Sequence, residues 1–318
     1  MQEITRYDHG IMAVDSGFLR PHFDAIHLIR EGDRLALVDT GTNHSVPRVL
    51  AALEQEGATP EQVDYVLLTH VHLDHAGGAG QFMQKFPNAR LVVHPRGARH
   101  MIDPGKLWNA TVAVYGQQVA EASYGEIVPI AAERVIDATD GLSVSLNGRQ
   151  ISFHDSPGHA RHHVFIRDGR SGHIFTGDTF GVSYRELDQG GRPSIFPSTT
   201  PTQFDPLALN ASIDRIMNFA PEAVYLTHYS QVRDLDRLSA DMHRLVNAHA
   251  EIGEAHADQS PGTQRLASLT AAVQALVLSE RERQQWTVDE ATTLELFKGD
   301  IELNAAGIDA WLQSRENA

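Results

Sequence analysis

The sequence predicts a layered α/β protein with a helical extension, and three observations carry this prediction. Apolar runs of strand length alternate with stretches of helical periodicity over residues 24–94. Short apolar runs separated by turn residues follow over residues 133–177. From residue 231 to residue 318 the pattern is helical throughout, and we expect no strand there. We therefore expect an α/β domain at 1–230 and a helical extension at 231–318 that packs on it.

The first half of the chain alternates strands with helices. Residues 24–41 are predicted to form a β-hairpin, because two apolar runs flank a turn whose Gly32 allows positive φ. Residues 45–56 have apolar side chains at helical spacing, with Pro47 early, where a first turn tolerates it. Beyond these, we expect strands at 64–69 and 90–94 and a helix near 79–86.

The second half changes to short strands and then to helices. Asn147-Gly148 and Asp168-Gly169 lie between apolar runs and are expected to form hairpin turns. Residues 181–206 are rich in Gly, Pro, Ser and Thr, and loops of this length are usually functional or mobile. We expect a helix near 206–219, a strand near 222–227, helices at 231–257 and 263–283, and two shorter helices to the end.

Composition narrows the chemistry. The 318 residues include 18 histidines and no cysteine, which excludes disulfides, Cys-ligated zinc, iron–sulfur clusters and a Cys nucleophile. A bound metal must therefore be held by imidazole and carboxylate, which favours zinc, iron, manganese, cobalt or nickel. The formal net charge of −15 disfavours nucleic acid and anionic membranes as partners.

Targeting signals are also missing from the pattern. No stretch approaches the roughly 20 apolar residues of a transmembrane helix. The first 18 residues lack the basic segment and apolar run of a signal peptide. We therefore expect a cytoplasmic protein that acts on a small molecule, without a membrane or nucleic-acid partner.

Four potential metal ligands fall within six residues, directly after an apolar run: His70, His72, Asp74 and His75. In an extended loop His70 and His72 point the same way, because their spacing is two. The other two lie on the next turn, where they can point to a second position. This arrangement suits two adjacent metal ions, whereas the alternative, a solvated polar loop, gains nothing from such clustering.

Three further strand ends repeat this logic. His159 follows the turn Ser156-Pro157-Gly158, Asp178 ends the run Phe175-Thr176-Gly177, and His228 ends the run Val224–Thr227. A single His or Asp at a strand end is more often structural than catalytic. Their joint occurrence, in this order after the first cluster, favours a common site.

These motifs resemble those of the metallo-β-lactamase superfamily. The matching segments are LVDTG at 37–41, THVHLDHAGG at 69–78, SPGHA at 156–160, FTGD at 175–178 and LTH at 226–228. The resemblance covers about residues 10–230 and implies a four-layer αββα sandwich, with two face-to-face sheets, helices outside and the site at one edge. The chain looks most like the glyoxalase II-like and lactonase-like branches, within a subgroup with a GHAxHH signature, and the absence of cysteine argues against the commonest β-lactamase subclass, which uses a cysteine ligand.

The resemblance also implies a ligand set for two divalent ions. One ion would be held by His70, His72 and His159, the second by Asp74, His75 and His228, with Asp178 bridging them. Asp39 would orient a ligand histidine such as His70 or His75, because metal-bound imidazoles usually need such a partner. We expect zinc, with iron or manganese as alternatives.

The chemistry expected of such a centre is hydrolysis. Two ions ~3.5–4 Å apart can share a hydroxide that attacks the carbonyl of a small ester, thioester or lactone. Asp74 is the candidate catalytic residue, because it could pass the proton to the leaving group. Three alternatives stay open: an iron-dependent redox enzyme of the persulfide dioxygenase or flavodiiron kind, a phosphodiesterase or nuclease, and a binding or signalling protein with little turnover.

Several neighbours of the motifs are further candidates. His162 and His163 could donate hydrogen bonds to the site or contact the substrate; the alternative is that they merely begin the next strand. Tyr184 and Tyr229 could donate a hydrogen bond to an oxyanion, with simple packing as the alternative. Glyoxalase II carries a helical extension that contacts its thioester substrate, but residues 231–318 lack an obvious basic cluster for a glutathione-like anion. They could instead cover the pocket or form a homodimer surface.

Overall fold

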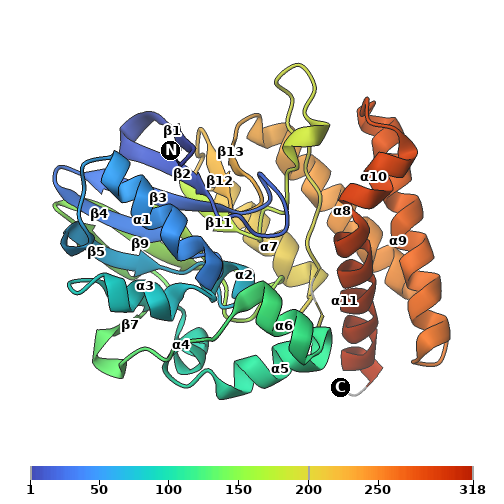
Figure 1. Ribbon diagram of the computed structural model, residues 1–318. Coiled ribbons are helices and arrows are strands. Elements are labelled where there is room, and N and C mark those ends of the chain that lie inside the picture. Colours follow the sequence, from blue (N-terminus) through green and yellow to red (C-terminus); the bar gives the residue numbers. More distant parts are fainter. Residues whose placement is uncertain (1, 200, 317–318) are drawn as a thin grey trace. The chain divides into compact units, whose positions relative to one another are not determined.

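The computed structural model describes residues 2–199 and 201–316 and is shown in Figure 1. Its contacts divide it into two compact units, which are described separately. The first unit comprises Met1–Asp155, His162–Gly177 and Pro221–Gln231. The second comprises Ser156–Arg161, Asp178–Ala220 and Val232–Ala318. Within the described residues, no helix has both the length and the apolar character needed to cross a membrane.

A seven-stranded sheet follows the order of the chain. Its strands are β1 (Ile4–Arg6), β2 (Ile11–Asp15), β3 (Ala25–Glu31), β4 (Arg34–Val38), β5 (Val63–Leu67), β6 (Arg90–Val93) and β7 (Val135–Asp137). The first four strands pair antiparallel, and β4 to β7 pair parallel. The predicted hairpin at 24–41 is confirmed as β3 and β4, and the predicted strands at 64–69 and 90–94 as β5 and β6.

The parallel strands are joined by helices, as parallel pairing requires. These are α1 (Val46–Gln55), α2 (Leu73–Ala76), α3 (Ala79–Lys85), α4 (Pro95–Ile102), α5 (Gly105–Tyr115) and α6 (Gln117–Tyr124). The predicted helices at 45–56 and 79–86 are confirmed as α1 and α3. The strand–helix alternation thus delivers the end of each parallel strand to the same sheet edge.

The second sheet has six strands in the order β13-β12-β11-β10-β9-β8. Their bounds are β8 (Ser143–Leu146), β9 (Arg149–Asp155), β10 (Val164–Asp168), β11 (Ile174–Gly177), β12 (Val224–Leu226) and β13 (Ser230–Val232). The predicted Asn147-Gly148 turn joins β8 to β9, and both residues have positive φ, 47° and 92°. A two-residue hairpin turn of this kind requires positive φ at both positions.

The expectation of no strand after residue 230 is wrong at its first residues. β13 extends to Val232, and α8 begins only at Leu235, after Asp234 in the left-handed conformation. Gln231 donates a hydrogen bond to the hydroxyl of Tyr225 on β12, at 2.9 Å. This strand depends on a partner in the tertiary structure, and three residues carry too little periodicity to reveal it.

Two apolar cores define the layers of the first unit. One lies between the two sheets and includes Val38 and Leu67 from the first sheet and Phe153 and Ile166 from the second. The other covers the opposite face of the first sheet, where α1 and α3 contribute side chains such as Leu53 and Phe82. The unit is therefore helix on sheet on sheet, and the predicted α/β sandwich class is confirmed.

The second unit is helical beyond the loop at 178–205. Its helices are α7 (Pro206–Met217), α8 (Leu235–Ala255), α9 (Thr263–Gln284), α10 (Glu290–Leu296) and α11 (Lys298–Glu316). Within this unit α8, α9 and α11 pack side by side (Figure 1). The fully buried Arg265 of α9 pairs with Asp309 and Glu316 of α11. The division into a domain at 1–230 and an extension at 231–318 stays a prediction.

A buried ion pair joins β9 to β10 in the first unit. Nε and Nη2 of Arg149 each donate to one carboxylate oxygen of Asp168 at 2.6 Å, and Nη1 donates to the carbonyl of His9 at 2.7 Å. Burial alone would raise the pKa of Asp168, but hydrogen bonds from Arg149 and Ser171 outweigh it and hold the pKa below its usual 3.8. The pair is therefore charged in the folded protein at neutral pH.

Replacing this carboxylate should be costly. We expect Asp168→Asn to lower the free energy of unfolding by about 3–5 kcal/mol, because it leaves the buried Arg149 guanidinium with only the more distant Glu31 carboxylate, 3.5 Å from its Nη1. Since the folded-state pKa is depressed, wild type should lose this contribution as the pH falls below about 4, and the variant should lack that dependence. Urea titrations at several pH values measure both effects.

The matched control is Arg6→Met in the same unit. It removes a partly exposed pair with Glu56 that should contribute about 1 kcal/mol or less. Equal losses in the two variants would contradict the importance of the buried pair.

Candidate metal centre

The histidine cluster begins where β5 ends. His70 and His72 follow the strand directly, and α2 carries Asp74 and His75. His70 and His75 are fully buried, whereas Asp74 is partly exposed. The backbone after α2 runs close to a neighbouring loop, since a Cβ on Gly78 would lie 2.8 Å from the Thr42 carbonyl oxygen. The glycines after the cluster therefore allow α2 to sit against that loop.

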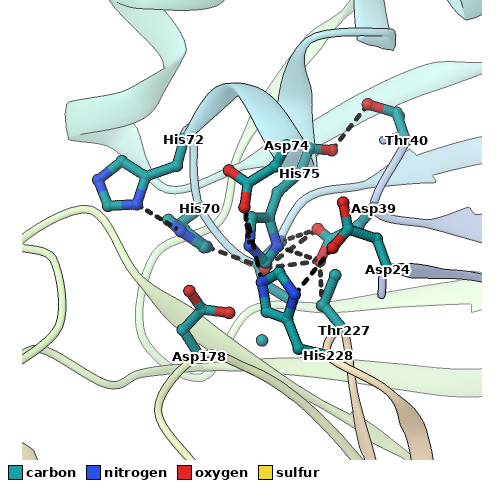
Figure 2. A network of polar contacts seen from close by, with 12 residues as sticks. Asp24, Asp39, Thr40, His70, His72, Asp74, His75, Asp178, Thr227 and His228 are labelled. Atoms are coloured by element: carbon teal, nitrogen blue, oxygen red, sulfur yellow. Dashed lines mark hydrogen bonds and ion pairs between the residues drawn. The ribbon is translucent and has the colours of Figure 1, made fainter. Parts of the chain in front are cut away.

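Asp74, His75 and His228 converge on one point in the first unit. The Nε2 atoms of His75 and His228 each lie 3.5 Å from Oδ2 of Asp74 (Figure 2). One donor atom from each of the three residues lies within 4.8 Å of the other two. Two imidazole nitrogens and a carboxylate oxygen thus face a shared position.

Two buried carboxylates orient these imidazoles. Nδ1 of His75 lies 2.9 Å from Oδ2 of Asp39, and Nδ1 of His228 lies 2.8 Å from Oδ1 of Asp24 (Figure 2). An ionised carboxylate can only accept hydrogen bonds, so Nδ1 carries the hydrogen in each ring and Nε2 keeps its lone pair. That tautomer, backed by a carboxylate, is the usual state of a metal-ligating histidine.

The Asp24 carboxylate has a perturbed pKa. Burial raises its pKa to about 6, although the neighbouring His228 lowers it. The sequence did not identify Asp24 as a site residue, because a single aspartate ahead of β3 has no motif around it. Its role depends on β12 bringing His228 to the start of β3, where Ala25 donates its backbone N–H to the Thr227 carbonyl at 2.7 Å.

Asp39 connects three strand ends. It follows β4 in a left-handed conformation, with φ of 56°. Its carboxylate accepts from the backbone N–H of Thr69 at 2.9 Å, after β5, and from the hydroxyl of Thr227 at 2.8 Å, after β12. Of the two histidines that the sequence proposed as its partner, the structure places it on His75. His70 is instead 3.2 Å from the Thr69 hydroxyl through its Nδ1.

His70 and His72 form the second histidine group of this unit. Nε2 of His70 lies 2.9 Å from Nδ1 of His72. The rings of His162 and His163 lie against them, with centroids 5.5 Å from His72 and 4.7 Å from His70, respectively. Both sequence candidates therefore border the histidine cluster, in the segment that leads into β10.

Gly177 belongs to the same packing. A Cβ there would lie 2.6 Å from Nε2 of His163 and 2.7 Å from the Thr69 hydroxyl, and its φ is 48°. Only glycine meets both requirements, close approach and positive φ, without strain. The FTGD motif thus has a steric reason for its glycine.

The second unit holds His159 and Asp178. Nδ1 of His159 donates to the Ser198 carbonyl, 2.9 Å away, and its Nε2 lies 3.3 Å from Oδ2 of Asp178. Both side chains are buried. The preceding Gly158 has a φ of 129°, and a Cβ there would clash with the backbone of Leu209 on α7. This histidine repeats the arrangement of the others: Nδ1 on an oxygen, Nε2 toward a carboxylate.

The two tyrosines proposed from the sequence belong to different units. Tyr229 is buried in the first unit with its ring 4.8 Å from the ring of His22. Tyr184 is buried in the second unit, where its hydroxyl donates to Asp300 of α11 at 2.8 Å. Their proposed role as oxyanion donors stays a prediction.

Two other tyrosines approach the site without a sequence signal. Burial raises the pKa of Tyr124 on α6 and of Tyr115 on α5, and the charge of Asp74 raises both further. A tyrosine on a helix carries no sequence pattern that would mark it as close to Asp74. A cavity of about 390 Å³ is lined by residues in or just after α5 and α6: Trp108, Glu121, Gly125, Glu126 and Ile127.

The donors present fit a divalent ion of the zinc, iron or manganese kind. They are imidazole nitrogens and carboxylate oxygens, with no thiolate in the chain. Nδ1 faces Asp39 in His75, the Asp24 carboxylate and the Phe23 carbonyl in His228, and the Ser198 carbonyl in His159, which leaves Nε2 of each ring to bind the ion. Such oriented, deprotonated nitrogens are what a metal site requires.

Comparisons with known proteins point to one superfamily. A profile of the Metallo-beta-lactamase superfamily matches residues 20–228. A hydroxyacylglutathione hydrolase of Xanthomonas campestris pv. campestris (strain B100) is 31% identical over 187 residues, which is 58% of this chain and 54% of that protein. The chain thus spans about half the length of this relative. A metallo-beta-lactamase fold-containing protein of Sulfurisphaera tokodaii is 25% identical over 62% of this chain and 69% of its own.

Solved structures show the same fold. An archaeal superfamily protein from Sulfolobus tokodaii superposes with a TM-score of 0.64 at 19% identity, covering 95% of this chain and 99% of its own. A family protein from Thermus thermophilus also has a TM-score of 0.64 at 19% identity, covering 97% and 94%. At this identity the likeness speaks for the fold alone.

Removing the carboxylate behind His75 should weaken metal binding. We expect Asp39→Asn to reduce zinc affinity by about 10–100-fold, because the imidazole loses the partner that fixes its tautomer and orientation. Competition with a chromophoric chelator, well below the melting temperature, measures the affinity. Asp64→Asn is the control, since it removes only the pair with Arg34 on β4. Equal affinity in wild type and Asp39→Asn would contradict the orienting role.

Proposed function

The chain belongs to the metallo-β-lactamase superfamily, and from this premise we propose that it is a metal-dependent hydrolase with a dinuclear centre. The observation that carries the proposal is the convergence of His75 and His228 on Asp74, with each Nδ1 held by a buried carboxylate. The proposed substrate is a small ester, thioester or lactone. Relatives named hydroxyacylglutathione hydrolase support an acyl compound, and the net charge of −15 disfavours nucleic acid.

The proposed ligand set keeps the two groups of the sequence analysis. One ion is assigned to His70, His72 and His159, the other to Asp74, His75 and His228, and Asp178 is shared. The assignments of Asp178 and His159 are supported by their places in the chain. Asp178 directly follows β11, and His159 precedes β10 by five residues. Zinc is the proposed metal, and iron or manganese suits the same donors.

The division of labour follows from the donors. Divalent ions at such ligands lower the pKa of water toward ~7 and polarise a carbonyl oxygen. The side chains of the protein orient the ligands and transfer the proton. Asp39 and Asp24 keep the hydrogen on Nδ1, so that His75 and His228 stay oriented during a reaction. Asp74 is partly exposed, and its carboxylate is the group proposed to take a proton and return it to the leaving oxygen or sulfur.

The ligand assignment has a direct test. Wild type purified without chelators should contain two metal ions per chain, and His70→Ala/His72→Ala should lose at least one, because two nitrogen donors are gone. Elemental analysis measures the content. His44→Ala/His100→Ala, which changes two histidines outside the clusters, is the control. Unchanged metal content in the first double variant would exclude the assignment.

The reaction class is tested on the same preparations. A panel of esters, thioesters, lactones and phosphodiesters should show turnover by wild type on acyl substrates and none by the metal-depleted double variant. Oxygen consumption with iron in the site, and no hydrolysis, would favour a redox enzyme instead. Turnover confined to phosphodiesters would favour a phosphodiesterase.

The proton-transfer role of Asp74 makes a separate prediction. Asp74→Asn should lower kcat by about 10²–10⁴-fold while metal remains bound, because an amide cannot carry the proton. Metal content is measured on the same sample, which separates loss of the base from loss of an ion. Asp103→Asn serves as the control. Wild-type rates in Asp74→Asn would exclude the role.

A further inference from the structure

We infer that Asn304, on α11, is a positioning residue that sets the direction of the His159 imidazole by holding the peptide segment around Ser198. The inference rests on the proposed function, because it takes His159 as a metal ligand. Every residue involved belongs to the second unit. It gives the C-terminal helices a part in the metal chemistry.

The first link is the hydrogen bond between His159 and Ser198. A backbone carbonyl only accepts, so Nδ1 of His159 must donate across the 2.9 Å contact, and Nε2 keeps its lone pair. The direction of the buried ring therefore follows the direction of one carbonyl. Residues 197–199 belong to no helix or strand. Their backbone groups must find partners elsewhere.

Asn304 supplies those partners on both sides of Ser198. Its Oδ1 accepts from the backbone N–H of Thr199 at 2.8 Å, and its Nδ2 donates to the Pro197 carbonyl at 2.9 Å. The Thr199 hydroxyl donates to the backbone carbonyl of Asn304 at 3.2 Å. Thr199 and Asn304 are buried. One side-chain amide thus clamps the two residues that flank the carbonyl facing His159.

His249 of α8 fixes which way this amide points. Burial lowers the pKa of His249 to about 4, so the ring is neutral at pH 7 and carries one hydrogen. Its Nδ1 lies 2.8 Å from the Leu245 carbonyl and must donate to it. Its Nε2 therefore accepts, and the group 3.2 Å away on Asn304 is the donor Nδ2. The amide oxygen is thereby turned toward Thr199.

The chemistry of this clamp is specific to asparagine. The position needs a donor for Pro197 and His249 and an acceptor for Thr199 at the same time, inside a buried site where water cannot replace them. Leucine matches the shape and supplies neither group. Aspartate supplies only the acceptor. The two helices α8 and α11 thus specify the path of residues 197–199 through side-chain hydrogen bonds.

The test compares Asn304→Leu with wild type in metal binding. We expect the weaker of the two zinc dissociation constants, from chelator competition, to rise by about 10–100-fold. Thr199→Val, which removes only the hydroxyl link to Asn304, should weaken binding by a smaller factor. The melting temperature of each metal-free protein is recorded alongside, so that loss of folding is separated from loss of affinity.

Thr293→Val is the matched control. Thr293 is fully buried on α10 of the same unit, and its hydroxyl donates to the Asp289 carbonyl at 2.8 Å. It should lower the metal-free melting temperature and leave both zinc constants unchanged. Zinc constants equal to wild type in Asn304→Leu, or in Thr199→Val if the leucine variant does not fold, would overturn the positioning role. A wild-type chain that binds no zinc would contradict the proposed function instead.

Discussion

The site of the first unit depends on the burial of one charge. Asp39 is almost fully enclosed at the ends of three strands, and a buried carboxylate is tolerated only when its oxygens are hydrogen-bonded. Thr69, Thr227 and His75 provide those hydrogen bonds. Thr69 follows β5, His75 lies in α2 and Thr227 follows β12, so the contacts that satisfy the charge also align the segments that carry the histidines. Stability and site geometry here have one cause.

A single rule then recurs at three histidines. Nδ1 meets an oxygen, from Asp39 for His75, from Asp24 for His228 and from the Ser198 carbonyl for His159. Nε2 in each ring faces a carboxylate. The rule matters because an imidazole binds a metal through an unprotonated nitrogen, and a fixed hydrogen on Nδ1 guarantees one on the far side. The first unit achieves this with carboxylates, joined at His228 by the Phe23 carbonyl at 3.2 Å, and the second with a backbone carbonyl.

The elements were predictable where periodicity was strong. The hairpin β3–β4, the helices α1 and α7 and the strands β8 to β11 follow from apolar spacing and from turn residues such as Asn147-Gly148. β13 was missed, because a three-residue strand is stabilised by its neighbour rather than by its own pattern. Asp24, Tyr115, Tyr124 and Asn304 were missed for a related reason. Each is a single ordinary residue whose significance depends on what lies opposite.

The sequence by itself determined the kind of chemistry available. The sequence contains 18 histidines, no cysteine and five motifs at strand ends, which indicate an all-His/Asp centre on a layered α/β fold. Local patterns suffice for this, because they reveal both the type of ligand and its place at the end of a strand. Only the tertiary structure decided which partner orients each imidazole. It placed Asp39 on His75 rather than His70, put Asp24 behind His228, and joined α11 through Asn304 to the two residues that flank Ser198. Hydrogen-bond direction depends on distances of about 3 Å between residues far apart in the chain, and no local pattern records those distances.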